Sequence, residues 1–398
     1  MTTEERLAAL ESKMAALTTP PSDYYTSQYS GEEIDAAITQ GASTAAAVAD
    51  KADKTQLCNP NLLDNWYFGR PVNQRDGYVV LPGTTYYDNT WTAVGTTTGY
   101  IKIDSIIPTG GAWITIGGTQ YLVSAPSDSV VRGYVGAGYT VDRWKLVESA
   151  HVVTIEAGSI TLRKPANTAD FVYAQYFEGA TLEFLRGKTA TISVMDSNGN
   201  VYSKTLLIPV SGMFDSDNLY IAGDNWWIDL IVLPSGDFYI RFVSITKAET
   251  TLGIQAAKLE LGPQQTLAHQ DADGNWVLNE VPDYGEQLRR CQRYFLKIGD
   301  VSHHCSLGNG LARDAQNVSI TIPTPVTMRT VPGLIAIPAG FTMRHSDTLI
   351  SGGANFSVDA SSQNSIMLKI QSQVALTPGD MWEAFLQPNG SIMFSADL

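Results

Sequence analysis

The chain of 398 residues is too long for one ordinary domain, and its 44% hydrophobic content excludes a wholly disordered or fibrous protein. Charged residues make up only 17% of the chain, while glycine, threonine, serine and tyrosine are abundant, so we expect a mainly β fold. The net charge of −14 argues against nucleic acid as a partner, because such binding depends on neutralising phosphates. From Arg290 to the end, however, seven basic residues balance seven acidic ones.

The sequence predicts neither a membrane-spanning segment nor a signal peptide. No apolar run approaches the roughly 18–20 residues that a bilayer span requires, and Met1–Arg6 lack the features of a signal peptide. We therefore expect a protein made in the cytosol, without membrane insertion. The spacing of Cys58, Cys291 and Cys305 fits neither a disulfide framework nor a zinc site, which predicts reduced thiols.

The first predicted helix has the a/d spacing of a short coiled coil. Its apolar positions are Leu7, Leu10, Met14 and Leu17. Fewer than two heptads cannot hold a helix together alone, so an ordinary amphipathic helix is an equally good interpretation. Pro20 ends this helix.

A second helix is predicted after a linker. Ser30 and Glu33 form a capping box, and Ile34 and Ile38 then begin a thin apolar stripe on one face. Such a stripe buries little area within its own chain, so we expect it to pack against copies of itself or against a larger assembly. Residues 1–57 are thus predicted to form an N-terminal helical region for assembly, which the resemblance described below implies is an attachment and trimerisation region.

From Asn59 the sequence alternates apolar and polar residues between turn signals, which is typical of half-buried antiparallel strands. Hairpin turns are predicted at Asp196–Gly199 and Pro234–Asp237. The predicted strands are Tyr100–Ile106, Ala112–Ile116, His151–Glu156, Ser159–Arg163, Thr189–Met195, Asn200–Ile208, Trp226–Leu233, Asp237–Val243 and Ile254–Leu261. This pattern favours a β-sandwich over residues 59–262.

A connector over residues 263–295 is expected to contain a hairpin turn at Asp271–Gly274 and a helix or irregular segment over Tyr284–Lys297. Residues 296–398 are predicted to form a separate β-rich head. Its predicted strands are Val318–Ile322, Gly333–Ile337, Gly340–Arg344, Asn355–Val358, Ser365–Gln371 and Ser391–Ser395.

Several segments, in this order, resemble tail-fibre or receptor-binding proteins of bacteriophages and prophages of gut Firmicutes. They are Tyr29–Ile38, Asn61–Asn65, Pro71–Arg75, Gly138–Trp144, Ala256–Gly262 and Glu286–Phe295. The resemblance covers about residues 30–295 and includes a carbohydrate-binding-like sandwich. Residues 76–137 depart from it, and we interpret them as an inserted strand pair or small subdomain.

The resemblance implies a homotrimer in the virion tail, with its N-terminus toward the phage baseplate and its head toward the bacterium. The implied receptor is a cell-surface polysaccharide or a teichoic-acid-type glycan. We expect no catalytic residue, metal or cofactor. Three weak glycan sites on one body would gain avidity from their proximity.

Two aromatic clusters are candidate glycan sites, since sugar recognition combines an aromatic platform with neighbouring polar groups. The first consists of Asp224, Asn225, Trp226 and Trp227, and the second of Tyr86, Tyr87 and Trp91. Either cluster has a structural alternative, in a core or at a contact between protomers. Trp144, which follows Asp142 and Arg143, is instead predicted to be a buried anchor.

Two alternative functions stay open on the sequence. A phage-tail enzyme that degrades surface polysaccharide needs only a pair of carboxylates, which leave no spacing signature. A purely structural baseplate component, or a fibre of a phage-tail-like bacteriocin, is the other. His303, His304 and Cys305 do not suggest a metal site, because adjacent residues of a strand face opposite ways.

Overall fold

The computed structural model describes Thr2, residues 4–9, Ser12 and residues 59–397, without 76, 104, 108–110, 124–128, 300–301, 337–339, 352–354 and 389. The chain divides into two units, Met1–Leu57 and Cys58–Leu398. In the first unit residues 4–9 are helical, and Leu7 is exposed there. Leu10, Met14, Leu17, Ile34 and Ile38 lie outside the described residues, so the coiled coil stays a prediction. None of the described helices has the length and apolar character of a membrane span.

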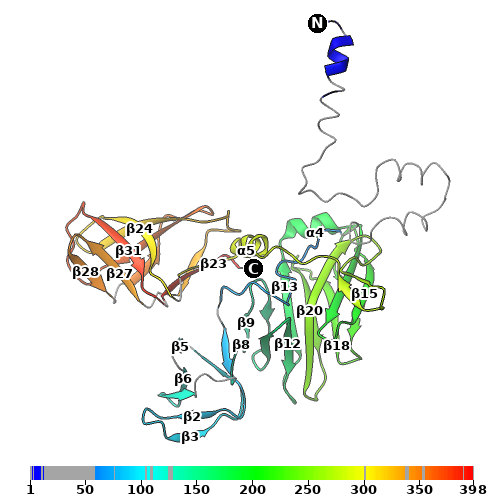
Figure 1. Cartoon of the computed structure of the whole chain (residues 1–398), viewed down its shortest axis with the longest axis horizontal. Helices are drawn as coiled ribbons and strands as arrows, with labels where there is room; N and C mark the ends of the chain where they lie inside the picture. The colour runs from blue at the N-terminus through cyan, green and yellow to red at the C-terminus, as the bar shows by residue number, and fades with distance from the viewer. Residues whose placement is uncertain are drawn as a thin grey trace, which may run out of the picture. The chain divides into compact units, whose positions relative to one another are not determined.

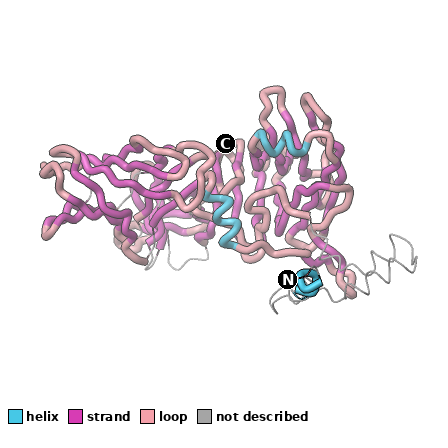
Figure 2. Tube along the Cα trace, turned by 90° about the horizontal axis from the view of Figure 1, so that it is seen from above, coloured by secondary structure: helices cyan, strands magenta, loops and turns pink. Residues whose placement is uncertain are grey.

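Antiparallel strands dominate the second unit (Figures 1 and 2), which confirms the mainly β prediction. The largest sheet has eight strands, in the order β15 (Val201–Leu207), β14 (Thr189–Asp196), β20 (Thr250–Leu261), β12 (Ser159–Lys164), β11 (Val152–Glu156), β8 (Val130–Val135), β1 (Tyr78–Val80) and β4 (Ile101–Lys102). Its backbone groups are paired along most of this path. Only β15 and β4 are edge strands.

A seven-stranded sheet faces this one. Its order is β16 (Phe214–Asp215), β18 (Trp226–Val232), β19 (Phe238–Ser244), β13 (Phe171–Phe177), β10 (Lys145–Leu146) and β9 (Gly138–Tyr139), with β17 (Leu219–Ile221) also paired to β18. One core joins the two sheets, because alternate side chains such as Ile192 of β14 and Ile228 of β18 belong to the same buried cluster. The predicted sandwich is thus observed. The short helix α4 (Gly179–Leu185), which the sequence pattern does not predict, buries Leu182 and Leu185 in this core.

The predicted anchor Trp144 lies in the centre of this core and is fully buried. Its indole Nε1 donates to the Asn65 carbonyl at 3.1 Å. The neighbouring Arg143 is also buried, and its Nε lies 3.0 Å from Oδ2 of Asp64. Arg143 has a φ of +75°, so the chain turns sharply here and sends consecutive side chains into different layers.

The insertion contributes to two sheets. Strands β1, β4 and β8 extend the eight-stranded sheet, whereas a separate five-stranded sheet has the order β3 (Ala93–Thr96), β2 (Thr85–Tyr87), β7 (Thr119–Val123), β6 (Gly111–Ile116) and β5 (Ser105–Ile107). Val80, Ile114 and Val123 belong to its own small core. The insertion is therefore a subdomain, one of the two predicted forms.

The connector contains a hairpin of β21 (Ala268–Gln270) and β22 (Trp276–Leu278), followed by helix α5 (Tyr284–Gln292). In the turn, Oδ1 of Asp271 accepts hydrogen bonds from the Asp273 and Asn275 amides, both at 2.9 Å, as predicted for a turn. The Asp283 side chain caps α5 by accepting from the Glu286 amide at 2.8 Å. The helix is shorter than predicted, since the apolar Phe295 already begins a strand.

The head has a core of its own between two sheets. A three-stranded sheet has the order β23 (Phe295–Gly299), β32 (Ser391–Ser395) and β26 (Gly333–Ala336). A seven-stranded sheet has the order β28 (Thr348–Ser351), β27 (Phe341–His345), β31 (Met381–Leu386), β24 (Cys305–Ala312), β25 (Asn317–Pro323), β30 (Ser365–Gln371) and β29 (Asn355–Val358). The prediction did not include β24 and β31, which form the middle of this sheet.

Gly299 is expected to be indispensable at the end of β23. It has a φ of +140°, and a Cβ added there would lie 2.2 Å from the Gly390 carbonyl oxygen. Because the obstacle is backbone, we expect Gly299→Ala to destabilise the head by roughly 1–3 kcal/mol, measured by urea denaturation. Gly333→Ala is the matched control, because a Cβ at Gly333 in the same small sheet meets nothing within 4 Å. Equal stability of the two variants would contradict this prediction.

Candidate glycan-binding site

The two adjacent tryptophans of β18 face opposite sides of the seven-stranded sheet. Trp226 is 2% exposed, packs edge-on against Phe171 with ring centroids 4.9 Å apart, and donates from Nε1 to Oγ1 of Thr250 at 3.0 Å. Trp226 is therefore a core residue, and the prediction that it offers a sugar platform is corrected. Asp224 and Asn225 are exposed in the turn before β18.

The outer face of this sheet carries Trp227 among other aromatic and charged side chains. We call this surface the aromatic face; it consists of Tyr176, Tyr220, Trp227, Asp229, Tyr239 and Arg241. In the sheet register Trp227 pairs with Tyr220, Asp229 with Arg241, and Tyr239 with Tyr176. Their alternate neighbours Ile228, Leu230 and Ile240 all belong to the sandwich core, which fixes the aromatic face on the outside.

An ion pair holds the middle of the aromatic face. Nε and Nη2 of Arg241 lie 2.8 and 3.1 Å from Oδ1 and Oδ2 of Asp229, in a bidentate arrangement. Nε1 of Trp227 also donates to Oδ2 of Asp229, at 3.0 Å. Burial raises the pKa of the Asp229 carboxyl, while the hydrogen bonds from Arg241 lower it, and the net shift is upward. The indole is therefore held in one orientation by a buried carboxylate.

Tyrosine rings lie on both sides of this ion pair. Tyr220, which is 48% exposed, has its ring centroid 6.1 Å from that of Trp227, and the Tyr176 and Tyr239 centroids are 5.0 Å apart. Nζ of Lys145 lies 5.6 Å from the Tyr176 centroid. The aromatic face thus offers two ring pairs with the partly exposed Arg241 guanidinium between them. This combination suits the apolar C–H face and the hydroxyl rim of a sugar.

The second predicted cluster lies at the β2–β3 turn of the insertion. Trp91 is 62% exposed and its ring centroid is 6.3 Å from that of Tyr87, whereas Tyr86 contacts Tyr121 at 5.1 Å within the subdomain. Oδ1 of Asp88 accepts from the Thr90 and Thr92 amides, both at 2.9 Å, and these bonds stabilise the turn. Tyr87 and Trp91 therefore form an accessible pair, whereas Tyr86 packs against the core of the subdomain, which corrects its prediction as a platform residue.

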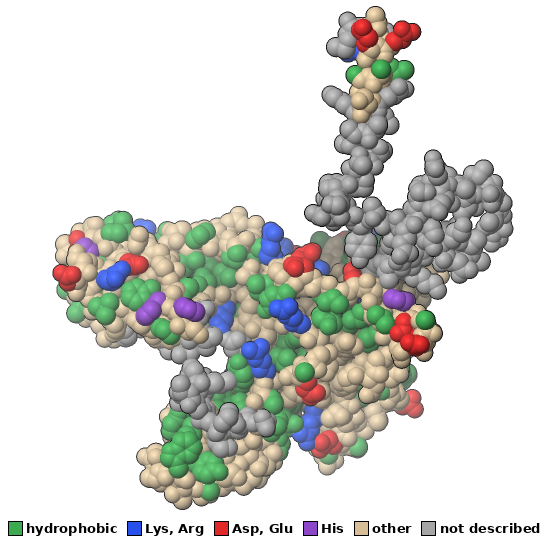
Figure 3. All heavy atoms as spheres, viewed as in Figure 1, with side chains coloured by type: hydrophobic (Ala, Val, Ile, Leu, Met, Phe, Trp, Pro, Cys, Tyr) green, Lys and Arg blue, Asp and Glu red, His purple; other side chains and the backbone are tan. Residues whose placement is uncertain are grey.

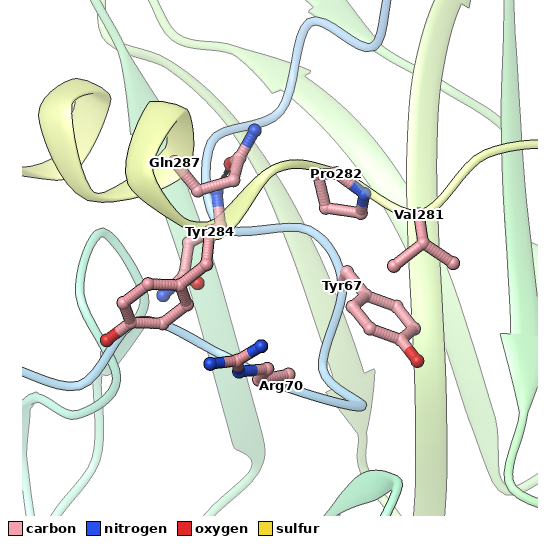
Figure 4. A pocket seen from close by; sticks show the side chains of 7 residues that line it. Tyr67, Arg70, Val281, Pro282, Tyr284 and Gln287 are labelled. Atoms are coloured by element: carbon pink, nitrogen blue, oxygen red, sulfur yellow. Dashed lines mark hydrogen bonds between the residues drawn. The ribbon is translucent and has the colours of Figure 1, made fainter.

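A third candidate site is a cavity that is too small for a sugar. It lies between the first sandwich segment and α5, with a volume of about 50 Å³ against the roughly 300–1,000 Å³ of ligand pockets. Figure 4 shows the Arg70 guanidinium beside the Tyr284 ring, and its Cζ is 4.9 Å from the ring centroid. Tyr67 and Val281 lie on the other side of the pocket. We interpret this site as packing between the connector and the sandwich.

The described residues offer little for metal or nucleophilic chemistry. No group of three or more His, Cys, Asp or Glu side chains in this part of the chain is arranged to hold a metal ion. The His304 ring contacts Phe385 edge-on, with centroids 5.8 Å apart. On the face drawn in Figure 3, acidic and basic side chains are interspersed rather than gathered into a patch of one sign.

Cys291 is expected to be unreactive in the folded protein. Cys291 lies on the buried side of α5, and burial raises the pKa of its thiol well above the ordinary value, so little thiolate forms at neutral pH. Cys305 is only half-buried and serves as the internal comparison. Brief iodoacetamide treatment with peptide mass mapping should label Cys305 well before Cys291, and urea should abolish the difference. Equal labelling without urea would contradict the prediction.

The sequence prediction missed most of the aromatic face. It included Trp227 but not Tyr176, Tyr220, Asp229, Tyr239 or Arg241. A signal for part of it was present: the predicted turn at Pro234–Asp237 sets a hairpin register in which Asp229 lies opposite Arg241. No protein-family model and no curated protein matches this chain.

Proposed function

We propose that this protein is a phage tail-fibre or receptor-binding protein that attaches the virion to bacterial cell-surface glycans. The observation that supports the proposal best is the aromatic face, where Trp227 and Tyr220 lie beside the Asp229–Arg241 ion pair on a rigid sheet. Rings fixed by a sheet lose little conformational freedom on binding, which is what a sugar platform requires. The resemblance of residues 30–295 to such fibres supplies the biological setting.

In this proposal the protein acts as a homotrimer, with residues 1–57 joining it to the phage baseplate or tail and to its own copies. Each protomer brings a weak glycan site on its aromatic face, and avidity within one virion makes attachment firm. Light scattering on the full chain tests the assembly, with an expected mass of three times 43.1 kDa. A monomer would argue against the fibre and favour a stand-alone glycan-binding protein.

Binding of the full chain to whole cells tests the function. Fluorescently labelled protein is incubated with a panel of gut Firmicutes strains and with their purified wall polysaccharides and teichoic acids. Trp227→Ala should lose most of the binding, because it removes the ring on which the sugar stacks and the loss is repeated in every protomer, so the avidity falls as well. Phe184→Ala is the matched control, since this exposed aromatic side chain lies on α4, outside both clusters.

The outcomes separate the candidate sites and functions. Loss of binding in Trp227→Ala alone supports the aromatic face, whereas loss in Trp91→Ala alone moves the site to the insertion. If the unmodified protein binds no cell or polysaccharide of the panel, a structural tail component becomes the better proposal. Release of reducing ends from the polysaccharides would instead favour an enzyme.

A further inference from the structure

The opposite side of the sandwich carries a groove that the aromatic face does not involve. It lies on the outer side of the eight-stranded sheet and has a volume of about 410 Å³, within the roughly 300–1,000 Å³ of small-molecule sites. Its floor includes Thr154 of β11, Thr161 of β12 and Thr251 of β20. Thr154 is paired with Thr161, and Thr251 with Arg163, so hydroxyl groups from three adjacent strands face the same groove.

Arg163 is held firmly at the groove. Its Nε and Nη2 lie 3.0 and 2.6 Å from Oε1 of Glu249, and its Nη1 donates to the Tyr100 hydroxyl at 2.6 Å. The guanidinium Cζ is also 5.0 Å from the centre of the Tyr100 ring. Tyr100 belongs to the insertion and Arg163 to β12, so this contact joins the insertion to the threonine-bearing strands at the groove.

The insertion makes its own side of the groove partly apolar. Leu81 and Val131 line the groove together with Tyr100, and Val131 lies on β8, the neighbour of β11 in the sheet. The groove therefore has an apolar side and a hydroxyl-bearing side within one monosaccharide-sized volume. A pyranose ring has the same division between its C–H face and its hydroxyl groups.

The charges at the groove select against acidic ligands. Two carboxylates, Glu156 and Glu249, line the groove together with one guanidinium, that of Arg163. Glu249 already forms an ion pair with Arg163. Glu156 accepts one hydrogen bond, from Oγ1 of Thr154 at 3.3 Å, and makes no ion pair with any described residue. A phosphate or carboxylate would be repelled, whereas neutral hydroxyls or an ammonium group would be accepted.

A peptide strand does not suit this groove either. Strands β11, β12 and β20 each have a neighbour on both sides in the sheet, so their backbone groups are already paired. Recognition there must come from side chains, which excludes the addition of an extended peptide as another strand.

We propose that this groove binds a neutral or amine-bearing sugar residue. The proposal goes beyond the function proposed above, because it assigns a second saccharide site on the opposite sheet and does not require the aromatic face to bind. If both sites are used, a single protomer engages two sugar residues of a surface polymer, which doubles the number of contacts per fibre.

Saturation-transfer NMR on the full-length protein tests the proposal with methyl β-glucopyranoside, glucosamine and glucuronate as probes. Methyl β-glucopyranoside or glucosamine should give transfer, and glucuronate should bind more weakly than either. Thr161→Val keeps the shape of the side chain and removes its hydroxyl, so it should weaken binding by about 2- to 10-fold. Thr251→Val should do the same, whereas Thr115→Val on β6, outside the groove, should bind as the unmodified protein does.

The results distinguish this site from the aromatic face. Weakening in both groove variants but not in Trp227→Ala supports the groove, whatever the outcome of the cell-binding test. Transfer that Trp227→Ala abolishes and both groove variants retain overturns the groove proposal while supporting the aromatic face. Absence of transfer from all three probes, or tightest binding of glucuronate, also overturns it.

Discussion

Replacement of Trp144 by alanine is expected to lower the free energy of unfolding of the sandwich by about 3–5 kcal/mol, the range found for large aromatic residues in cores. Trp144 is fully buried and contacts three aromatic rings, with its centroid 5.3 Å from those of Phe68 and Tyr173 and 5.8 Å from that of Phe242. The variant leaves a cavity among these rings. It also removes the indole donor that satisfies the Asn65 carbonyl.

Trp91→Ala is the matched control for this experiment, since it removes the same side chain at an exposed turn. We expect its stability to change by no more than about 0.5 kcal/mol. Urea denaturation followed by far-UV circular dichroism measures both variants, because this signal does not depend on the lost tryptophan. Equal stability of Trp144→Ala and Trp91→Ala would show that Trp144 does not anchor the sandwich.

Local signals predicted much of the sandwich. The turn at Asp196–Gly199 joins β14 and β15 as expected, because Oδ1 of Asp196 accepts from the Asn198 and Asn200 amides, both at 2.9 Å. The turn at Pro234–Asp237 likewise joins β18 and β19. In both hairpins the turn chemistry and the alternation of side chains are encoded within a few residues.

The sequence did not predict strands that lack alternation between apolar and polar residues. Strand β13 is buried on both faces over much of its length, and even its polar Gln175 is enclosed, with Nε2 donating to the Asp64 carbonyl at 2.7 Å. Its sequence therefore lacks the period of two that identifies a half-buried strand. Strand β24 contains Gly308 and Gly310 and a register shift between Ser306 and Gly308, which hide it in the same way.

The candidate sites depend on pairings that a sequence does not state. Successive side chains of a strand point to opposite faces, so the sequence alone predicts that Trp226 and Trp227 face opposite ways. Only the packing of β18 on the core decides which of the two is outside. The groove needs β20 beside β12, and the two strands are far apart in the chain. Such long-range pairings are set by the whole core rather than by local preference.

Asp142 is expected to make the stability of the protein depend on pH. This carboxyl is buried between the start of the sandwich and the end of the head; its Oδ2 accepts from the Gln74 amide at 3.1 Å, and its Oδ1 lies 3.4 Å from Nε of Arg75. Arg75 also pairs with Asp397, at 2.7 Å. Burial raises the pKa of Asp142 to about 6, although Arg75 and the hydrogen bonds from Gln74 lower it.

The sign of the effect follows from this upward shift. Between the ordinary value of 3.8 and about 6, the folded chain holds a proton on Asp142 that the unfolded chain has released. The stabilisation is therefore complete below about pH 4 and is lost as the pH rises through about 6, a change of about 3 kcal/mol. Above pH 6 the folded protein carries a buried carboxylate that only Arg75 and the hydrogen bonds from Gln74 compensate.

Asp142→Asn isolates this contribution, because asparagine has nearly the same shape and does not titrate. Urea denaturation of both proteins at pH 4, 5, 6 and 7 gives the difference between their free energies of unfolding, in which the other carboxyl groups cancel. We expect the variant to gain stability relative to the unmodified protein by about 2.5 kcal/mol from pH 4 to pH 7, because part of the change of about 3 kcal/mol lies below pH 4. A constant difference would mean that Asp142 titrates alike in both states. A difference of opposite sign would mean that Arg75 outweighs burial and lowers the pKa in the folded chain.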